Sequence, residues 1–315
     1  MRTGVIQPLP GIGDMIWFQP ALASIAEASP EGKIILFTKV STQAAALFSG
    51  VTYIDSILPM PSGRGALAAL ANFLGAYVSL RRGKVDRLFI LHQSPRYRLA
   101  ARLAGIQEII AYPPALAQSK ENGWNKSLAF LEQRGIAVDY PYSQLNVDPA
   151  VVEAMRQRFV QYPQPWIVVA PGASTGARLW PEERFSFCAD ALIEKTGGTV
   201  FLIGAPNEKA RVDAVLSHCR NAEKTVSVVG LPFDQVMGLI ACSACLLGND
   251  SGPANVAAAL GRLAFPLCGT STPPLHSPNM HLIMPDLPPE SGEGMERISA
   301  QHALDVVLAE LTKTP

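Results

Sequence analysis

The sequence has little of what would place it in a specialised class of protein. Its five cysteines are an odd number without compact spacing, which argues against a disulfide framework and favours a reducing compartment. Lys plus Arg and Asp plus Glu both number 26, so no excess of charge indicates nucleic acid as a partner. With 17% charged and 48% hydrophobic residues, the composition is globular, which excludes a disordered chain.

Long hydrophobic runs are also lacking. The first residues, MRTGVIQPLPGIGD, contain no apolar stretch of the signal-peptide type. The best candidate for a membrane span, Gly65–Leu80, is shorter than the roughly 20 residues that a span needs, and it is rich in Ala and Gly. We therefore expect a packed helix in this segment and a cytoplasmic protein, which can still meet a membrane peripherally.

What the chain does contain is an alternation of short apolar runs with helical patterns, which indicates an α/β protein with parallel sheets. In the first half we predict strands at Thr3–Gln7, Lys33–Thr38, Ile54–Leu58, Arg87–Leu91 and Glu108–Ala111. In the second half we predict strands at Trp166–Ala170, Thr199–Ile203, Val226–Val229, Cys245–Gly248 and Arg262–Leu267.

Predicted helices separate these strands, and the length of 315 residues suits two domains. The helices are Met15–Ala28, Thr42–Phe48, Ala66–Arg81, Arg96–Leu103, Asn125–Arg134, Pro149–Tyr162, Pro181–Lys195, Glu208–His218, Pro232–Cys242, Pro253–Leu260 and Ser299–Leu311. A breaker-rich link at Tyr162–Pro165 places the boundary between residues 1–160 and 161–315. We expect two Rossmann-like domains with parallel sheets facing a central cleft, and the last helix can pack back on the first domain.

Ligands of open parallel sheets bind at the carboxyl ends of strands, so the strand-to-helix loops carry the candidate chemistry. In the first loop, Pro10–Asp14, two glycines allow a close approach of the backbone, and the following helix start favours negative charge. The loop lacks the third glycine of a dinucleotide fingerprint. Asp14 can cap the helix, or it can serve as a general base.

Two loops of the second half suit a diphosphate. Pro171–Pro181 combines glycines and hydroxyls with Arg178, whose planar fork can pair with two phosphate oxygens. Gly248–Asn255 again joins a strand to a helix and offers backbone N–H groups at the helix start. A further loop brings Glu208, which can cap its helix or accept hydrogen bonds from ribose hydroxyls.

Taken in order, these loops resemble those of the bacterial heptosyltransferase family (glycosyltransferase family nine), whose lipopolysaccharide members use ADP-heptose. The resemblance implies the GT-B fold, an N-terminal acceptor-binding domain and a C-terminal nucleotide-sugar-binding domain. It implies Asp14 as the catalytic residue. The donor-binding residues that it implies are Gly13, Ser174, Thr175, Arg178, Glu208, Asp250, Ser251, Gly252 and Asn255.

Three positions depart from the family pattern. Arg178 stands where many members have Lys, Ser251 replaces the usual Thr, and Asn255 occupies the place of a His. Ser keeps the hydroxyl and Arg keeps the charge, whereas Asn removes a titratable donor. The sugar can therefore be heptose or a related hexose or deoxysugar.

The implied reaction is an inverting displacement without a metal, in which Asp14 takes a proton from the acceptor hydroxyl. The acceptor is expected to be a glycan or a lipid-linked, lipopolysaccharide-type molecule, and the enzyme can contact the inner membrane peripherally. Candidate acceptor-binding residues are Arg64, Arg96, Arg98 and Lys120. Two other interpretations stay open, namely a nucleotide-sugar epimerase of GT-B fold and a catalytically silent nucleotide-sugar-binding protein.

Overall fold

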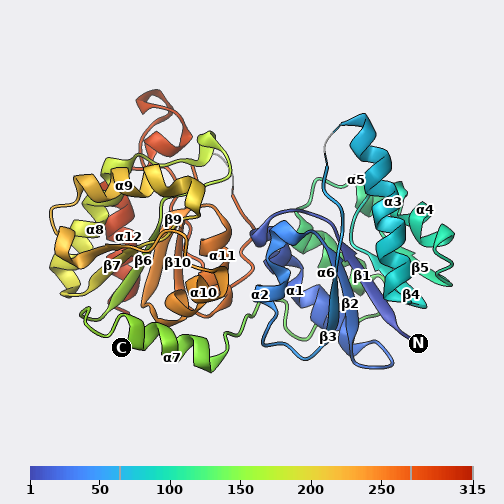
Figure 1. Ribbon diagram of the computed structural model, residues 1–315. Helices are drawn as coiled ribbons and strands as arrows, with labels where there is room; N and C mark the ends of the chain where they lie inside the picture. Colours follow the sequence, from blue (N-terminus) through green and yellow to red (C-terminus); the bar gives the residue numbers. More distant parts are fainter. Residues whose placement is uncertain (64, 270–271, 314–315) are drawn as a thin grey trace. The chain divides into compact units, whose positions relative to one another are not determined.

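The computed structural model describes residues 1–63, 65–269 and 272–313. The chain divides into two compact units, Met1–Asn146 and Val147–Pro315. Each unit contains a five-stranded parallel sheet with helices on both faces (Figure 1). The predicted α/β class and parallel sheets are therefore confirmed.

The first unit has its strands in the order β3-β2-β1-β4-β5. Their bounds are β1 (Thr3–Gln7), β2 (Ile34–Thr38), β3 (Ile54–Pro59), β4 (Arg87–Ile90) and β5 (Glu108–Ala111). The α-helices are α1 (Ile12–Glu27), α2 (Ala44–Leu47), α3 (Ala66–Gly83), α4 (Pro95–Leu103), α5 (Pro114–Gln118) and α6 (Gly123–Glu132). The strand order reverses between β1 and β4, which is where open α/β sheets bind ligands.

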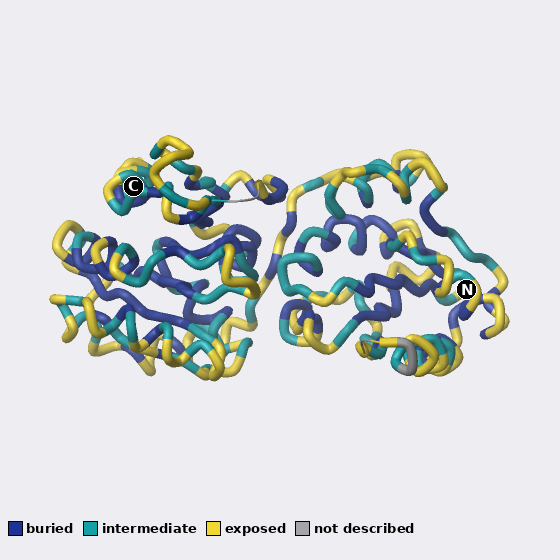
Figure 2. The backbone as a smooth tube through the Cα atoms, turned by 90° about the horizontal axis from the view of Figure 1, so that it is seen from above, coloured by how far each residue is buried: buried dark blue, intermediate teal, exposed yellow. Residues whose placement is uncertain are grey.

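Buried apolar side chains hold helices on the two faces of this sheet. On one face, Ile6 and Ile90 share a core with Leu80 of α3 and Tyr97 of α4. On the other face lies α6, whose Phe130 meets Phe89 of β4 edge to face at 6.5 Å between ring centroids. In Figure 2 the strands are largely dark blue, whereas many helical segments show exposed outer positions.

The second unit has its strands in the order β10-β9-β6-β7-β8, so its order reverses between β6 and β9. The strand bounds are β6 (Trp166–Ala170), β7 (Thr199–Leu202), β8 (Thr225–Ser227), β9 (Cys245–Asn249) and β10 (Leu263–Leu267). The α-helices are α7 (Pro149–Arg158), α8 (Glu182–Thr196), α9 (Lys209–His218), α10 (Phe233–Cys242), α11 (Gly252–Ala259) and α12 (Ala300–Leu311).

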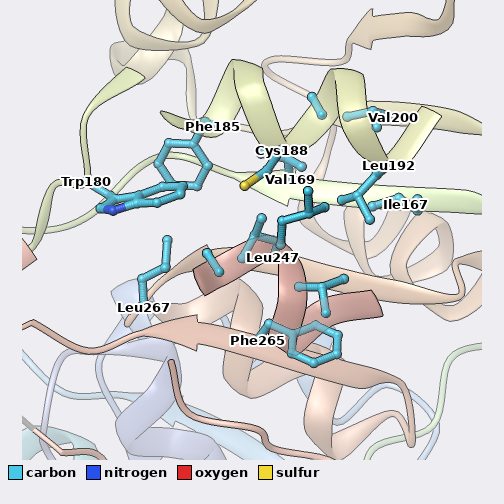
Figure 3. Close-up of a cluster of buried hydrophobic side chains, with 14 of the residues drawn as sticks. Ile167, Val169, Trp180, Phe185, Cys188, Leu192, Val200, Leu247, Phe265 and Leu267 are labelled. Atoms are coloured by element: carbon cyan, nitrogen blue, oxygen red, sulfur yellow. The ribbon is translucent and has the colours of Figure 1, made fainter. Parts of the chain in front are cut away.

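A large apolar core joins this second sheet to α8, α9 and α12. Figure 3 shows part of it, with Trp180 and Phe185 beside the strand residues Val169 and Leu267. The Trp180 and Phe185 rings meet edge to face at 4.9 Å. Trp180 is fully buried, so the segment that leads into α8 is anchored in the core.

One detail of the domain prediction needs correction. The division falls after Asn146 and not after residue 160, because α7 packs on α10, where a Cβ at Gly238 would lie 2.9 Å from Val151. The apolar residues of the last helix, α12, lie in the second unit's core beside α8, and its additional packing on the first domain stays a prediction. The short helix α5, which begins at the second of two consecutive prolines, was not predicted.

Candidate functional site

In the first unit, Asp14 lies in the first turn of α1, directly after the loop that follows β1. Its carboxylate Oδ2 accepts a hydrogen bond from the backbone N–H of Gly11 at 3.0 Å, so the predicted capping role is present. A Cβ at Gly11 would lie 2.7 Å from this oxygen, which explains why a glycine precedes the helix. Asp14 and the neighbouring Gly13 are half-buried, and the structure leaves the catalytic role of Asp14 as a prediction.

The basic residues predicted to bind an acceptor occupy different surroundings. Arg98 of α4 donates to the carbonyl of Tyr112 and lines a hollow of about 380 Å³ together with Gln93 and Pro114. Arg96 is exposed and stacks over the ring of Tyr97. Lys120 is exposed in the loop between α5 and α6. Arg64 lies outside the described residues.

His92, in the loop that follows β4, lies near the predicted Arg96 and near two lysines that the sequence did not single out. Burial, together with the smaller effect of the positive charges of Arg96, Lys39 and Lys126, lowers its pKa to about 4. Its Nδ1 accepts a hydrogen bond from the N–H of Ser94 at 3.0 Å. This end of the first sheet is therefore electropositive, although the whole chain has no formal net charge.

In the second unit, the loop between β6 and α8 has buried ends and an exposed tip. Pro171 and Trp180 are buried, whereas Ser174 and Thr175 are exposed. A short 3₁₀ turn, Gly176–Arg178, completes the tip. The two hydroxyls that the sequence assigned to a diphosphate are thus presented to solvent at the carboxyl end of β6.

Arg178 and Asp250 connect this loop to the one that follows β9. The guanidinium Nη1 of Arg178 lies 3.5 Å from Asp250 Oδ2 and 3.4 Å from its backbone oxygen. The Asp250 side chain is 9% exposed and that of Arg178 is 40% exposed, so the carboxylate is sheltered and the cation reaches solvent. The structure therefore brings together two loops that the sequence predicted to share one anion site.

Two side chains that the sequence did not identify bridge the ends of the β6–α8 loop. Asn249 donates to the carbonyl of Pro171 at 2.7 Å and accepts from the N–H of Trp180 at 3.1 Å. Arg211 donates to the same Pro171 carbonyl at 2.6 Å, and also to the carbonyl of Trp180 and the carboxylate of Glu182. Each of these two side chains thus connects the two ends of the loop. These bonds fix the positions of the loop ends beneath the exposed tip.

Glu208 lies against the same loop. Its carboxylate accepts a hydrogen bond from the N–H of Ala205 at 2.8 Å, which is the predicted cap. A Cβ at Gly172 would lie 2.1 Å from Glu208 Oε1, so only a glycine allows this approach. The carboxylate is consequently placed beside the start of the loop that carries Ser174 and Thr175.

At the start of α11, Ser251 is the N-cap and Gly252 the first helical residue. The Ser251 hydroxyl is buried and has no hydrogen-bond partner among the described residues. One turn later, Asn255 donates to the Ser251 carbonyl at 2.8 Å, and its Oδ1 lies 2.8 Å from Nε2 of the fully buried His276. Because an amide oxygen only accepts, His276 carries its proton on Nε2.

The imidazole of His276 therefore lies beside the position where the resembled family has a histidine. Burial lowers its pKa to about 4, so the ring is neutral at pH 7. Its other nitrogen, Nδ1, is buried without a hydrogen-bond partner in the part of the chain that the structure describes. Sequence spacing could not find this pair, since 21 positions separate the two residues.

Residues 1–63, 65–269 and 272–313 contain no group of three or more His, Cys, Asp or Glu side chains placed to hold a metal ion. Within the same residues, no helix combines the length and the apolar character that crossing a membrane requires.

Comparison with known proteins agrees with this arrangement. The model of glycosyltransferase family 9 (heptosyltransferase) matches residues 118–284, just over half of the chain. The lipopolysaccharide heptosyltransferase 2 of Escherichia coli K12 is 27% identical over 311 residues, covering 89% of this chain and 86% of the relative.

Solved structures show the same fold. A family 9 glycosyltransferase from Veillonella parvula has a TM-score of 0.82 at 17% identity, covering 99% of this chain and 97% of its own. The structure described as E. coli ADP-heptose LPS heptosyltransferase II has a TM-score of 0.80 at 22% identity, covering 99% of both chains. The predicted GT-B fold is thereby confirmed. The family match and the shared fold lead to one conclusion: this chain belongs to glycosyltransferase family 9, the heptosyltransferase family, and is a glycosyltransferase.

Proposed function

We propose that the enzyme transfers a heptose, or a related hexose or deoxysugar, from a nucleoside-diphosphate donor to a glycan or lipopolysaccharide-type acceptor, with inversion and without a metal. One observation carries the donor half of this proposal. The loops after β6 and β9, where the strand order of the second sheet reverses, are joined by Arg178 and Asp250.

The diphosphate is proposed to bind at the exposed tip of the β6–α8 loop and at the start of α11. Ser174 and Thr175 supply donors, and Arg178 supplies a charge that reaches solvent. The helix start at Gly252 adds backbone N–H groups and a favourable dipole. Glu208, whose carboxylate lies beside Gly172, is proposed to accept hydrogen bonds from the ribose hydroxyls.

In the reaction, the acceptor oxygen attacks the anomeric carbon while the bond from that carbon to the diphosphate breaks. Asp14 accepts the proton of the attacking hydroxyl, and the nucleoside diphosphate leaves with its bonding electrons. Arg178 and the N-terminus of α11 stabilise the negative charge that develops on the leaving group. A fixed donor of this kind contributes about 3–4 kcal/mol to lowering a barrier, which supports a reaction without a metal cofactor.

An anionic, lipid-linked acceptor is supported by the charge of the first unit. Arg96, Lys39 and Lys126 surround His92 at the end of β4, and Arg98 lines the hollow beside it. Relatives of similar length are named for heptose transfer to lipopolysaccharide, and one of them is described with ADP-heptose. We propose ADP-heptose as the first donor to test, in a cytoplasmic enzyme that meets the inner membrane peripherally.

A product assay tests this proposal. The enzyme is incubated in EDTA with ADP-heptose or other nucleotide sugars, with and without a lipopolysaccharide-core acceptor, and products are identified by mass spectrometry and NMR. The expected result is acceptor-dependent release of nucleoside diphosphate and a glycosidic bond of inverted configuration.

Three other outcomes would contradict the proposal. Isomerised donor formed without acceptor would indicate a nucleotide-sugar epimerase. Donor binding without turnover of any sugar would indicate a binding protein. Loss of all turnover in EDTA, restored by Mg²⁺, would overturn metal independence.

A further inference from the structure

The outer surface of α3 and α4 exposes apolar side chains in a regular pattern. On α3, Leu70, Leu74 and Val78 are 61%, 51% and 42% exposed and recur every four residues, so they form one stripe. On α4, Leu99 and Leu103 are 51% and 58% exposed with the same spacing. Exposed apolar side chains are ordinary when scattered, but stripes on neighbouring helices indicate a contact surface.

The two stripes face the same side of the first unit. Helices α3 and α4 pack side by side, as Figure 1 shows, and Arg81 of α3 donates to the carbonyl of Ala104 at the end of α4. Their inner residues, among them Leu80 and Ala100, share one core with the sheet. Since both helices cover the same sheet face, their outer stripes point away from it together. We call this surface, made by the five apolar residues named above, the α3–α4 face.

The charge on this face has one sign. Helices α3 and α4 contain five arginines and no Asp or Glu. Of these arginines, Arg81, Arg82 and Arg102 are exposed and lie within one turn of the apolar stripes. The carboxylates that follow in the sequence are engaged elsewhere, since Asp86 accepts from the N–H of Arg2 and Glu108 pairs with Arg87 at 2.6 Å.

We propose that the α3–α4 face docks on the surface of a bilayer that contains anionic lipids. Apolar side chains flanked by arginines are the pattern with which helices lie in a membrane interface, where the apolar groups enter the acyl boundary and the cations meet headgroup phosphates. A second copy of the chain fits less well. A two-fold contact through the same face would set arginines against arginines.

The surface adjoins the hollow proposed for the acceptor. Helix α4 presents Leu99 to the α3–α4 face, while Arg98 and Pro95 line the hollow. Docking would therefore hold a lipid-linked acceptor's headgroup near this end of the first sheet. The inference rests on the proposed function in one respect, the peripheral membrane contact, for which it names the surface. Vesicle binding can be measured without turnover.

The test is cosedimentation of the full chain with vesicles of phosphatidylcholine, with or without phosphatidylglycerol. We expect binding to the phosphatidylglycerol vesicles that weakens with added salt. Replacement of Arg81, Arg82 and Arg102 by Gln should weaken binding by about fivefold for each arginine. The pair Leu74→Ser and Val78→Ser should weaken it by at least about tenfold.

The control substitutions remove exposed apolar side chains and an exposed arginine from the second unit. Val160→Ser and Phe187→Ser replace apolar side chains that are 71% and 42% exposed, and Arg156→Gln replaces an exposed arginine. These should bind vesicles like the wild type. Because all the substituted residues are exposed, unchanged melting temperatures show that the variants fold.

Several results would overturn the inference. The wild type could fail to bind phosphatidylglycerol vesicles at low salt. The arginine variant could bind as well as the wild type, or the control variants could weaken binding as much as the variants of the α3–α4 face. A dimer in analytical ultracentrifugation that Leu74→Ser and Val78→Ser dissolve would assign the face to a second copy. A failure of the transfer assay with vesicle binding intact would instead contradict only the proposed transfer reaction.

Discussion

At the scale of single residues, Arg178 is the cation that we propose to meet the donor's diphosphate. It lies 3.5 Å from the sheltered Asp250 carboxylate and still reaches solvent. Arg178→Ala should raise the Kd for ADP in calorimetry by about tenfold or more, because charge-assisted hydrogen bonds are worth ~1.5–3 kcal/mol. Arg156→Ala, which removes an exposed arginine of α7, should leave the Kd unchanged. Equal affinities for all three proteins would remove Arg178 from the donor site.

The sequence could locate a candidate site residue where a local pattern marks the loop that carries it. Arg178 and Glu208 were placed on the correct loops, because strand ends and helix starts are marked by local patterns. Asn249 and Arg211 were missed. Their function depends on partners 78 and 40 positions away, and no local pattern records such a distance.

At the scale of elements, the β6–α8 loop depends on the two bridges at its base. Arg211→Lys keeps the charge beside Glu182, but one ammonium cannot replace the fork that also reaches the carbonyls of Pro171 and Trp180. We expect faster amide hydrogen exchange in residues 172–179 and an ADP affinity weaker by about tenfold or more, since small displacements of binding groups are costly.

The second bridge gives a matched test of the same element. Asn249→Ala leaves the buried N–H of Trp180 without its acceptor and should lower the free energy of unfolding by about 1–3 kcal/mol. It should also speed exchange in residues 172–179. The control is Arg220→Lys, which alters an ion pair with Asp190 in the same unit. If exchange in the loop stays at the wild-type rate in both bridge variants, the bridges do not position it.

Strand prediction succeeded best where a short apolar run has clear boundaries. Strands β1, β5 and β6 have the predicted bounds, because each is a short apolar run between breakers. Helix α5 was missed, since five residues that begin with a proline are too few to show a helical period. The assignment of α7 to the second unit also could not be read from its own sequence, because its packing on α10 decides it.

At the scale of the whole molecule, buried histidines make stability depend on pH. Burial lowers the pKa of His276 from 6.5 to about 4, so between these values the unfolded chain binds more protons than the folded one. The stability that the neutral, buried His276 contributes is fully present above pH 6.5 and is lost as the pH falls toward 4. Lowering the pH from 7 to 5 should therefore reduce the free energy of unfolding by about 1–2 kcal/mol through this histidine.

Urea denaturation of the wild type and His276→Gln at both pH values measures this contribution. Glutamine can still donate to Asn255 but does not titrate, while His92 titrates in both proteins. The variant should therefore lose less stability than the wild type between pH 7 and pH 5. Identical losses would show that His276 is not held neutral in the folded protein.

The central claim joins donor binding in the second unit to proton removal by Asp14, and Asp14→Asn tests it most directly. Asparagine can still accept the N–H of Gly11, so the start of α1 is preserved while the base is removed. The decisive measurement is the turnover of this variant with donor and acceptor, made beside its calorimetric Kd for the donor. We predict that turnover falls by about 10²–10⁴-fold with the Kd nearly unchanged. Wild-type turnover by the variant would contradict the account.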